Sequence, residues 1–290
     1  MKKMVRIVIC LTLLLVTFQV PTQSQDQDKE WFRVETVEGN AFFGYMVSQD
    51  DQSVILNVES VGEITIPRKN IRSMNRIDPD RIKNGAYWYE NPQATRYFFA
   101  PNAIGLPKGR GYYQNTWILF NNVNYGISDH FSLGGGVVPL FLFGSPATPI
   151  WILPKVSIPV SNDRFHLGAG AMIGGLIGSE TESLGILYGV GTLGDRDMNM
   201  TVGIGYGYAG DEISRTPLIN ISGMVRVSRR LYLLTENYFI PEADAGGILS
   251  AGARWTTGQF AVDFGLFRPT EGAGGLIGIP WLGVTIPFGR

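Results

Sequence analysis

The stretch Met198-Asn-Met-Thr-Val-Gly-Ile-Gly-Tyr-Gly-Tyr-Ala209 decides the fold of this protein. Large apolar or aromatic side chains alternate in it with asparagine, threonine and glycine. Successive side chains of a β-strand point to opposite faces, so the pattern predicts one apolar face and one face of small or polar residues. A soluble sandwich would normally add a charged outer face. The pattern is therefore typical of a barrel strand with a lipid-facing wall and a narrow lumen.

The same alternation recurs along the second part of the chain and predicts an all-β protein with an antiparallel transmembrane β-barrel of about twelve strands. The expected strands are 94–100, 114–127, 130–142, 150–160, 164–177, 183–193, 197–209, 215–227, 229–240, 247–257, 259–267 and 279–288. Tight turns alternate with longer connections between them. Short periplasmic turns and longer outer loops give this rhythm, so we expect both ends of the barrel chain in the periplasm.

Charged residues divide the chain into two zones. Residues 28–83 hold 18 charged residues in 56, whereas 84–290 hold 27 in 207, and 33 of the 37 glycines lie beyond residue 100. We therefore expect a small periplasmic β-module at 28–75, a linker at 76–93 and the barrel at 94–290. The module shows short strands at 31–36, 41–48, 53–58 and 63–66, which favours a small SH3-like or Sm-like barrel. It is either a solvated accessory module or a site for a periplasmic protein partner.

The first residues predict a signal peptide over 1–25. Lys2, Lys3 and Arg6 precede the apolar run 7–16, and a polar stretch follows it, with cleavage expected near Ser24 or Gln25. Cys10 lies before most of the apolar run, where a lipid-bearing cysteine is not expected. These features predict a secreted protein, and together with the barrel pattern they predict the outer membrane as its location.

The overall composition excludes several classes of partner and cofactor. The chain has 24 Lys and Arg against 25 Asp and Glu, so no nucleic-acid partner is expected. A single cysteine and two histidines disfavour a metal site, and no cofactor is expected. Gly189–Gly194 and Gly205–Gly210 match G-x-G-x-x-G, but both lie in strand patterns with no helix following, which argues against a dinucleotide site.

The chain resembles outer-membrane β-barrel proteins of the Bacteroidota type. The signal peptide, the segment Ala100–Tyr113 and the last strand carry the resemblance. The last strand resembles the terminal signal read by the barrel-assembly machinery, although Gly289 and Arg290 follow its aromatic residue. Its apolar positions are Leu282, Val284, Ile286 and Phe288. The resemblance implies location and architecture, with outer-membrane lipids and the assembly machinery as partners, and no particular task.

Five charged residues have the parity of the lumenal face, which suggests a charged row inside the barrel. They are Lys155, Arg226, Glu236, Arg254 and Asp263. A tight turn at Gly258 sets a register in which Arg254 faces Asp263 across a hairpin. The row would either close the barrel by pairing or line a narrow channel.

Sequence reasoning leaves three function classes in order. The first is a structural or interaction barrel, and the alternative is a narrow channel for small solutes. A membrane-embedded lipase or protease is the less favoured third, because His130 and His166 are expected at the periplasmic rim. The paired acids at 180–182 and 211–212 are expected to be solvated loop charges.

Overall fold

The structure is a computed structural model that describes residues 29–83, 86–142, 147–161, 164–178, 183–241, 246–271 and 277–289. The chain divides into two compact units, Met1–Gly85 and Ala86–Arg290. The expected signal peptide, the acids at 180–182 and Arg290 lie outside the described residues. No helix in the described part of the chain is long and apolar enough to cross a membrane.

The first unit is a five-stranded antiparallel sheet with the strand order β4-β3-β2-β1-β5. Its strands are β1 (Trp31–Thr36), β2 (Ala41–Gln49), β3 (Ser53–Val58), β4 (Gly62–Pro67) and β5 (Ile71–Arg76). The short helix η3 (Arg68–Asn70) joins the last two, and η4 (Pro79–Arg81) and β6 (Ile82–Lys83) follow. The buried core of the sheet consists of Val34, Val54, Leu56, Val58 and Ile66. Its relation to SH3-like folds stays a prediction.

A carboxyl group fixes the turn between β2 and β3. The backbone N–H groups of Gln52 and Ser53 donate to Asp50 Oδ1 at 2.8 and 2.6 Å. These bonds hold the pKa of the Asp50 carboxyl below its ordinary value. The turn is thus closed by a side chain, as is common where an aspartate begins a turn.

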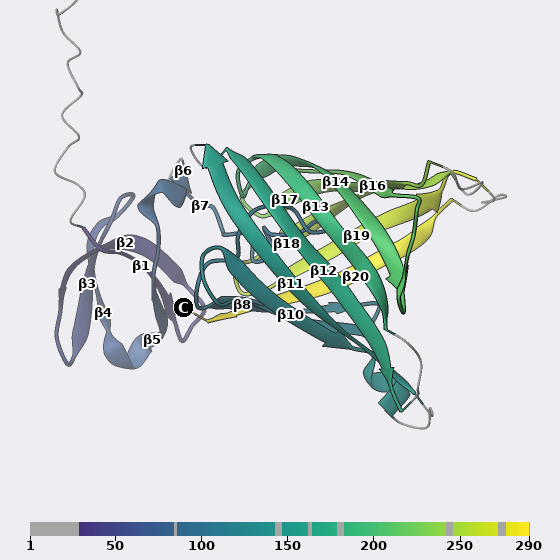
Figure 1. The fold of residues 1–290 in the computed structure, drawn as a ribbon. Helices are drawn as coiled ribbons and strands as arrows, with labels where there is room; N and C mark the ends of the chain where they lie inside the picture. The colour runs from purple at the N-terminus through teal and green to yellow at the C-terminus, as the bar shows by residue number, and fades with distance from the viewer. Residues whose placement is uncertain are drawn as a thin grey trace, which may run out of the picture. The chain divides into compact units, whose positions relative to one another are not determined.

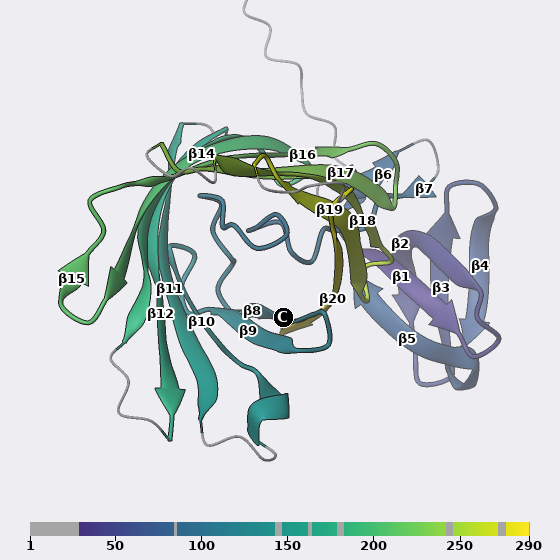
Figure 2. The same cartoon turned by 90° about the vertical axis from the view of Figure 1, so that its right-hand side faces the viewer.

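The second unit is a closed barrel of twelve antiparallel strands (Figures 1 and 2). The wall consists of β8 (Arg110–Thr116), β9 (Phe120–Gly126), β10 (Phe131–Val137), β11 (Thr148–Ser161), β12 (Phe165–Ile177), β13 (Leu184–Gly194), β14 (Met198–Ala209), β16 (Leu218–Arg226), β17 (Leu231–Phe239), β18 (Gly247–Thr256), β19 (Ala261–Pro269) and β20 (Ile279–Gly289). Pairing of β20 with β8 closes the ring. Short β7 (Ala86–Tyr87) precedes the wall, β15 (Glu212–Ile213) extends one edge of β14, and η5 (Pro139–Leu142) follows β10.

The two ends of the barrel differ in their connections. At one end, which we call the turn end, β8 begins and β20 ends, since Arg110 pairs with Gly289. Tight connections such as 127–130, 195–197 and 257–260 lie at this end. The opposite end, which we call the loop end, carries the longer connections, including 210–217 and 270–278.

The predicted alternation is confirmed in β14, whereas in β13 the large side chains of Ile186 and Val190 face the lumen and Leu187 is exposed outside. In β14 the side chains of Met198, Met200 and Val202 are at least half exposed on the outside, while Asn199 and Thr201 are buried inside. A one-residue shift of register would exchange these two sets, so burial of the polar set fixes the register. The barrel therefore presents a mainly apolar outer surface, while its inner surface is polar in β14 and partly apolar elsewhere, as at Leu153 and Ile186.

Two expected strands differ from the structure. The stretch 94–100 is not a wall strand, and its backbone pairing is limited to an isolated bridge between Arg96 and Pro101. The expected strand 114–127 is a hairpin, β8 and β9, which turns at Trp117 and Ile118 with φ of 51° and 66°. The barrel thus has the expected twelve strands, but 94–100 is not one of them and 114–127 supplies two. Neither turn residue is a glycine or asparagine, so the turn carries none of the usual sequence signals.

Candidate functional site

A segment of the second unit runs inside the barrel, and we call residues 88–109 the inner segment (Figure 2). Most of its side chains between Asn91 and Leu106 are buried. Bonds within the segment, such as Tyr97 N–H to the Ala100 carbonyl oxygen at 3.0 Å, satisfy part of its backbone, and the other buried backbone groups need partners as well. Side chains from the inner face of the wall supply many of them.

Arg254 on β18 and Asp263 on β19 form the first anchor. They lie directly opposite each other in the β18–β19 register, and Arg254 Nε and Nη2 donate to the two carboxylate oxygens at 2.7 and 2.8 Å. Arg254, which is fully buried, also donates to the backbone carbonyl oxygens of Gln93 at 2.8 Å and Tyr97 at 2.6 Å. The guanidinium therefore joins two wall strands to the inner segment.

Glu236 on β17 forms the second anchor. Its Oε2 atom accepts hydrogen bonds at 2.9 Å from three consecutive backbone N–H groups, those of Phe98, Phe99 and Ala100. Its Oε1 atom accepts one from the Tyr238 hydroxyl at 2.8 Å. Converging N–H groups form a concavity that suits an anion. One buried carboxyl group thus fixes the bend of the inner segment.

Lys155 on β11 forms the third anchor, with the opposite polarity. Its Nζ atom donates to the carbonyl oxygens of Asn102 and Ile104 at 2.9 and 2.8 Å. An ammonium group has three donors and no acceptor, so a cluster of carbonyl oxygens is a suitable partner. The anchor lies beyond the Glu236 anchor along the inner segment, and together the three anchors hold residues 93–104.

Neutral side chains add further bonds between wall and segment. The Tyr97 hydroxyl donates to Asn199 Oδ1 at 2.6 Å, and the backbone N–H of Ala103 donates to the Thr192 hydroxyl at 2.8 Å. Gln114 Nε2 donates to the Phe98 carbonyl oxygen at 3.1 Å. These contacts come from strands spread around the barrel, so the inner segment is bound on several sides.

Apolar packing holds the same segment. Phe98 lies 5.3 Å from Phe267 and 5.6 Å from Trp281 between ring centroids. Glycines on the wall make room for it: a Cβ atom at Gly265 would come within 3.0 Å of the Phe98 ring and 2.8 Å of a wall carbonyl oxygen. This packing gives a physical reason for glycine on part of the inner face.

The five charged residues expected in a lumenal row have separate partners. Arg254 and Asp263 are brought together, whereas Glu236 and Lys155 bind backbone groups of the inner segment. Arg226 pairs with Asp197 at 3.1 Å near the turn end, and its guanidinium lies 4.9 Å from the Trp88 ring. Sequence reasoning missed Asp197 and the inner segment itself. The prolines at 92 and 101, which bracket 94–100, were the available signal that this stretch is no ordinary strand.

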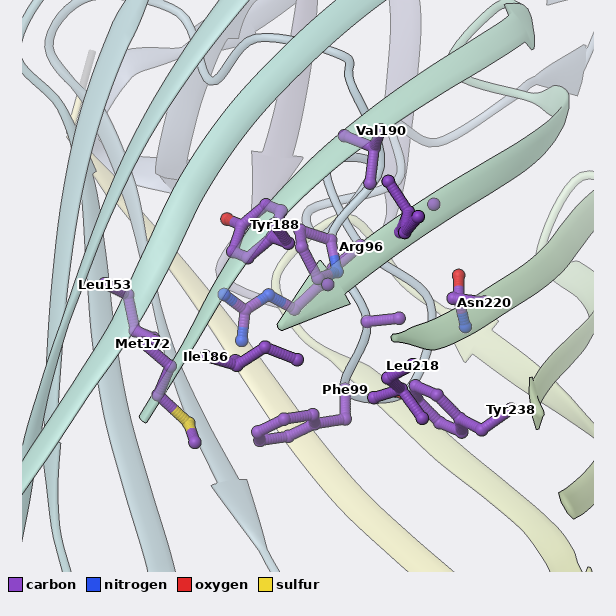
Figure 3. Close-up of a pocket in the computed structure, with 15 residues that line it drawn as sticks. Arg96, Phe99, Leu153, Met172, Ile186, Tyr188, Val190, Leu218, Asn220 and Tyr238 are labelled. Atoms are coloured by element: carbon purple, nitrogen blue, oxygen red, sulfur yellow. The ribbon is translucent and has the colours of Figure 1, made fainter. Parts of the chain in front are cut away.

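A cavity of about 100 Å³ remains inside the barrel, on the side of the inner segment that faces the loop end (Figure 3). Most of its lining is apolar and comes from Leu153, Met172, Ile186 and Leu218 on the wall. Arg96 and Phe99 of the inner segment complete it. The inner segment therefore bounds this cavity on one side, and wall strands bound it laterally.

The last strand makes the closing contacts of the barrel. Leu282, Ile286 and Phe288 are exposed on the outer face, and β20 pairs with β19 on one side and β8 on the other. Val284 shares their parity and is partly exposed. Whether the assembly machinery reads these residues stays a prediction.

The histidines lie near the turn end. The exposed His130 has its Nδ1 atom 3.2 Å from the Ser157 carbonyl oxygen, and His166 is buried in β12. Asp211 and Glu212 are exposed at the loop end, the end of the barrel opposite to both histidines. In the described ranges, no group of three or more His, Cys, Asp or Glu side chains is placed to hold a metal ion.

Comparison with known proteins finds shape similarity alone. No family model matches the chain, and no curated protein matches it. Among solved structures, the KdgM porin is 8% identical over 62% of this chain and 99% of its own, with a TM-score of 0.46. A mutant of the Rh. blastica porin is 12% identical over 90% of this chain and 99% of its own, with a TM-score of 0.32. The assignment of a closed twelve-strand barrel rests on the strand pairing of this chain.

Proposed function

We propose that this protein is an outer-membrane barrel that is closed at rest by its own inner segment and has a structural or interaction role. The apolar outer face supports the membrane location, since an exposed apolar surface of this extent is unfavourable in water and suits lipid. The turn end, by the usual arrangement of such barrels, faces the periplasm. The module at 28–75 then lies there as well, where it can bind a periplasmic protein.

The observation that carries the proposal is the set of three buried charged anchors on the inner segment. Glu236 and Arg254 are completely buried and Lys155 nearly so, and each binds backbone groups of residues 93–104. Burying a charge is costly unless it is hydrogen-bonded, so these side chains favour one seated position of the segment. A segment held in this way blocks ion flow through the lumen.

A narrow solute channel is the second candidate, and the cavity favours it. Because Arg96 and Phe99 of the inner segment line one side of the cavity, that segment separates the cavity from the turn end. Displacing the segment would join the two sides. The barrel would then conduct small solutes in a minor, opened state.

Planar-bilayer recordings distinguish the two functions. We expect the full-length protein to be silent and a variant with residues 91–104 replaced by a short Gly-Ser linker to show steady conductance steps. Glu271→Gln, which removes an exposed loop charge, serves as the control and should stay silent. Steady steps from the unmodified protein would contradict the closed barrel and support the channel.

A further inference from the structure

Arg96 places a positive charge in the cavity, and this residue is not one of the three anchors that hold the inner segment. Its side chain is 7% exposed, and Figure 3 draws it extending into the pocket between Tyr188 and Ile186. Its Nη2 atom donates to Asn124 Oδ1 at a long 3.3 Å, and its guanidinium lies 6.0 Å from the Tyr112 ring. Among the described residues, no carboxylate forms an ion pair with Arg96.

A buried guanidinium without a carboxylate is an unfavourable arrangement. Its five donors form a planar fork that matches a carboxylate or phosphate. The buried carboxyl of Glu236 is bound to three backbone N–H groups and a tyrosine hydroxyl, and neither it nor Lys155 lines the cavity. The cavity therefore holds a cationic guanidinium whose one hydrogen bond among the described residues is long.

The rest of the cavity selects for an apolar group of limited size. Most of the remaining lining is apolar, with Leu153, Ile186 and Leu218 on the wall and Phe99 44% exposed among them. Tyr238 and Asn220 also line the cavity, but the Tyr238 hydroxyl donates to Glu236 and Asn220 Nδ2 donates to the Asn237 carbonyl oxygen. An apolar cavity of about 150 Å³ accepts benzene, and this one measures about 100 Å³. Because the cavity is smaller than that and is not fully enclosed, it suits a short flexible chain rather than a ring.

We propose that the cavity binds a small amphiphilic carboxylate. The carboxylate pairs with the Arg96 guanidinium, and the short apolar group packs against Ile186 and Leu218. The ligand enters from the loop-end side of the inner segment, on which the cavity lies. This site requires neither conduction nor a displaced inner segment, so it stands apart from both functions proposed above.

Hexanoate and hexanamide provide a matched pair of probes. They have nearly the same shape, but only hexanoate carries a charge. With the full chain in a non-ionic detergent, titration calorimetry should show one saturable site for hexanoate and binding of hexanamide weaker by roughly tenfold or more. Equal affinities for the two probes would overturn the role of Arg96, and the absence of saturable hexanoate binding would overturn the site.

Two variants locate the site. Arg96→Gln should weaken hexanoate binding by roughly tenfold or more and leave hexanamide binding nearly unchanged. Leu218→Trp fills the cavity from the wall, keeps Arg96 and should abolish binding of both probes. This variant tests the site independently of whether the Arg96 variant folds. Arg229→Gln, an exposed arginine near the turn end, is the control. Hexanoate binding that persists unchanged in both cavity variants would contradict the proposal.

Discussion

In β14 the backbone groups bond to the neighbouring strands β13 and β16, whereas in the inner segment the N–H groups of Phe98, Phe99 and Ala100 bond to one side chain, Glu236. The strands of the wall share one arrangement: each bonds through its backbone to neighbouring strands. Pairing therefore requires little of any particular side chain. The inner segment depends on particular side chains at particular points of the wall. The wall should therefore tolerate many single changes, while the inner segment should respond strongly to a few.

The largest effect is expected from removing the closing strand. Deletion of Leu282–Arg290 removes most of β20 and leaves β8 and β19 with unpaired edges, which are very costly in lipid. We expect no membrane-assembled, heat-modifiable species on gel electrophoresis. Ile118→Ser, at the exposed tip of the β8–β9 hairpin, is the control and should assemble normally. A heat-modifiable truncated protein would show that β20 does not close the wall.

The next largest effect is expected at the Arg254 anchor. Arg254→Ala should destabilise the barrel by about 3–5 kcal/mol, because it strands the buried carboxylate of Asp263. It also removes donors to the inner segment, so it should cost more than Asp263→Ala. Denaturant unfolding of the single and double variants gives the coupling energy. Additive losses would mean that the two charges act independently.

A charge on the outer face should have a somewhat smaller effect. Val202 lies near the middle of β14 with half of its surface exposed. Val202→Arg should cost about 2–4 kcal/mol if this position lies near the middle of the bilayer. Val202→Leu is the matched control and should be close to neutral. Equal stabilities of the two variants in a lipid refolding assay would contradict a lipid-facing outer surface.

The smallest effect is expected from Glu236→Gln, which keeps the shape of the side chain but removes its charge. Hydrogen bonds to a charged group contribute about 1.5–3 kcal/mol, so the inner segment should loosen without loss of the barrel. We expect faster protease cleavage within residues 91–104 and brief conductance events, with normal heat modifiability. Cleavage at the rate of the Glu271→Gln control would show that Glu236 does not hold the segment.

The sequence predicted the wall because its evidence is local and repeated. Alternation in β14, β18 and β19 set the inner and outer faces, and the turn at Gly258 set the pairing of Arg254 with Asp263. The stretch 94–100 was misassigned because it also combines large apolar and polar residues in a run of strand length. The hairpin at Trp117 was missed because positive φ at these residues is imposed by the surrounding strands and has no sequence signal.

By itself, the sequence determined an all-β chain with a charged first zone, an alternating barrel wall and inward-facing charges. Only the tertiary structure decided what those charges bind. The alternation fixes the side of the wall on which Lys155, Arg226 and Glu236 lie. Lys155 and Glu236, however, bind backbone groups more than 50 positions away in the sequence, and Arg226 pairs with Asp197 in a neighbouring turn. The alternation in a strand shows to which face of the wall a side chain points. Its contacts depend on closure of the barrel around the inner segment, which brings distant residues together.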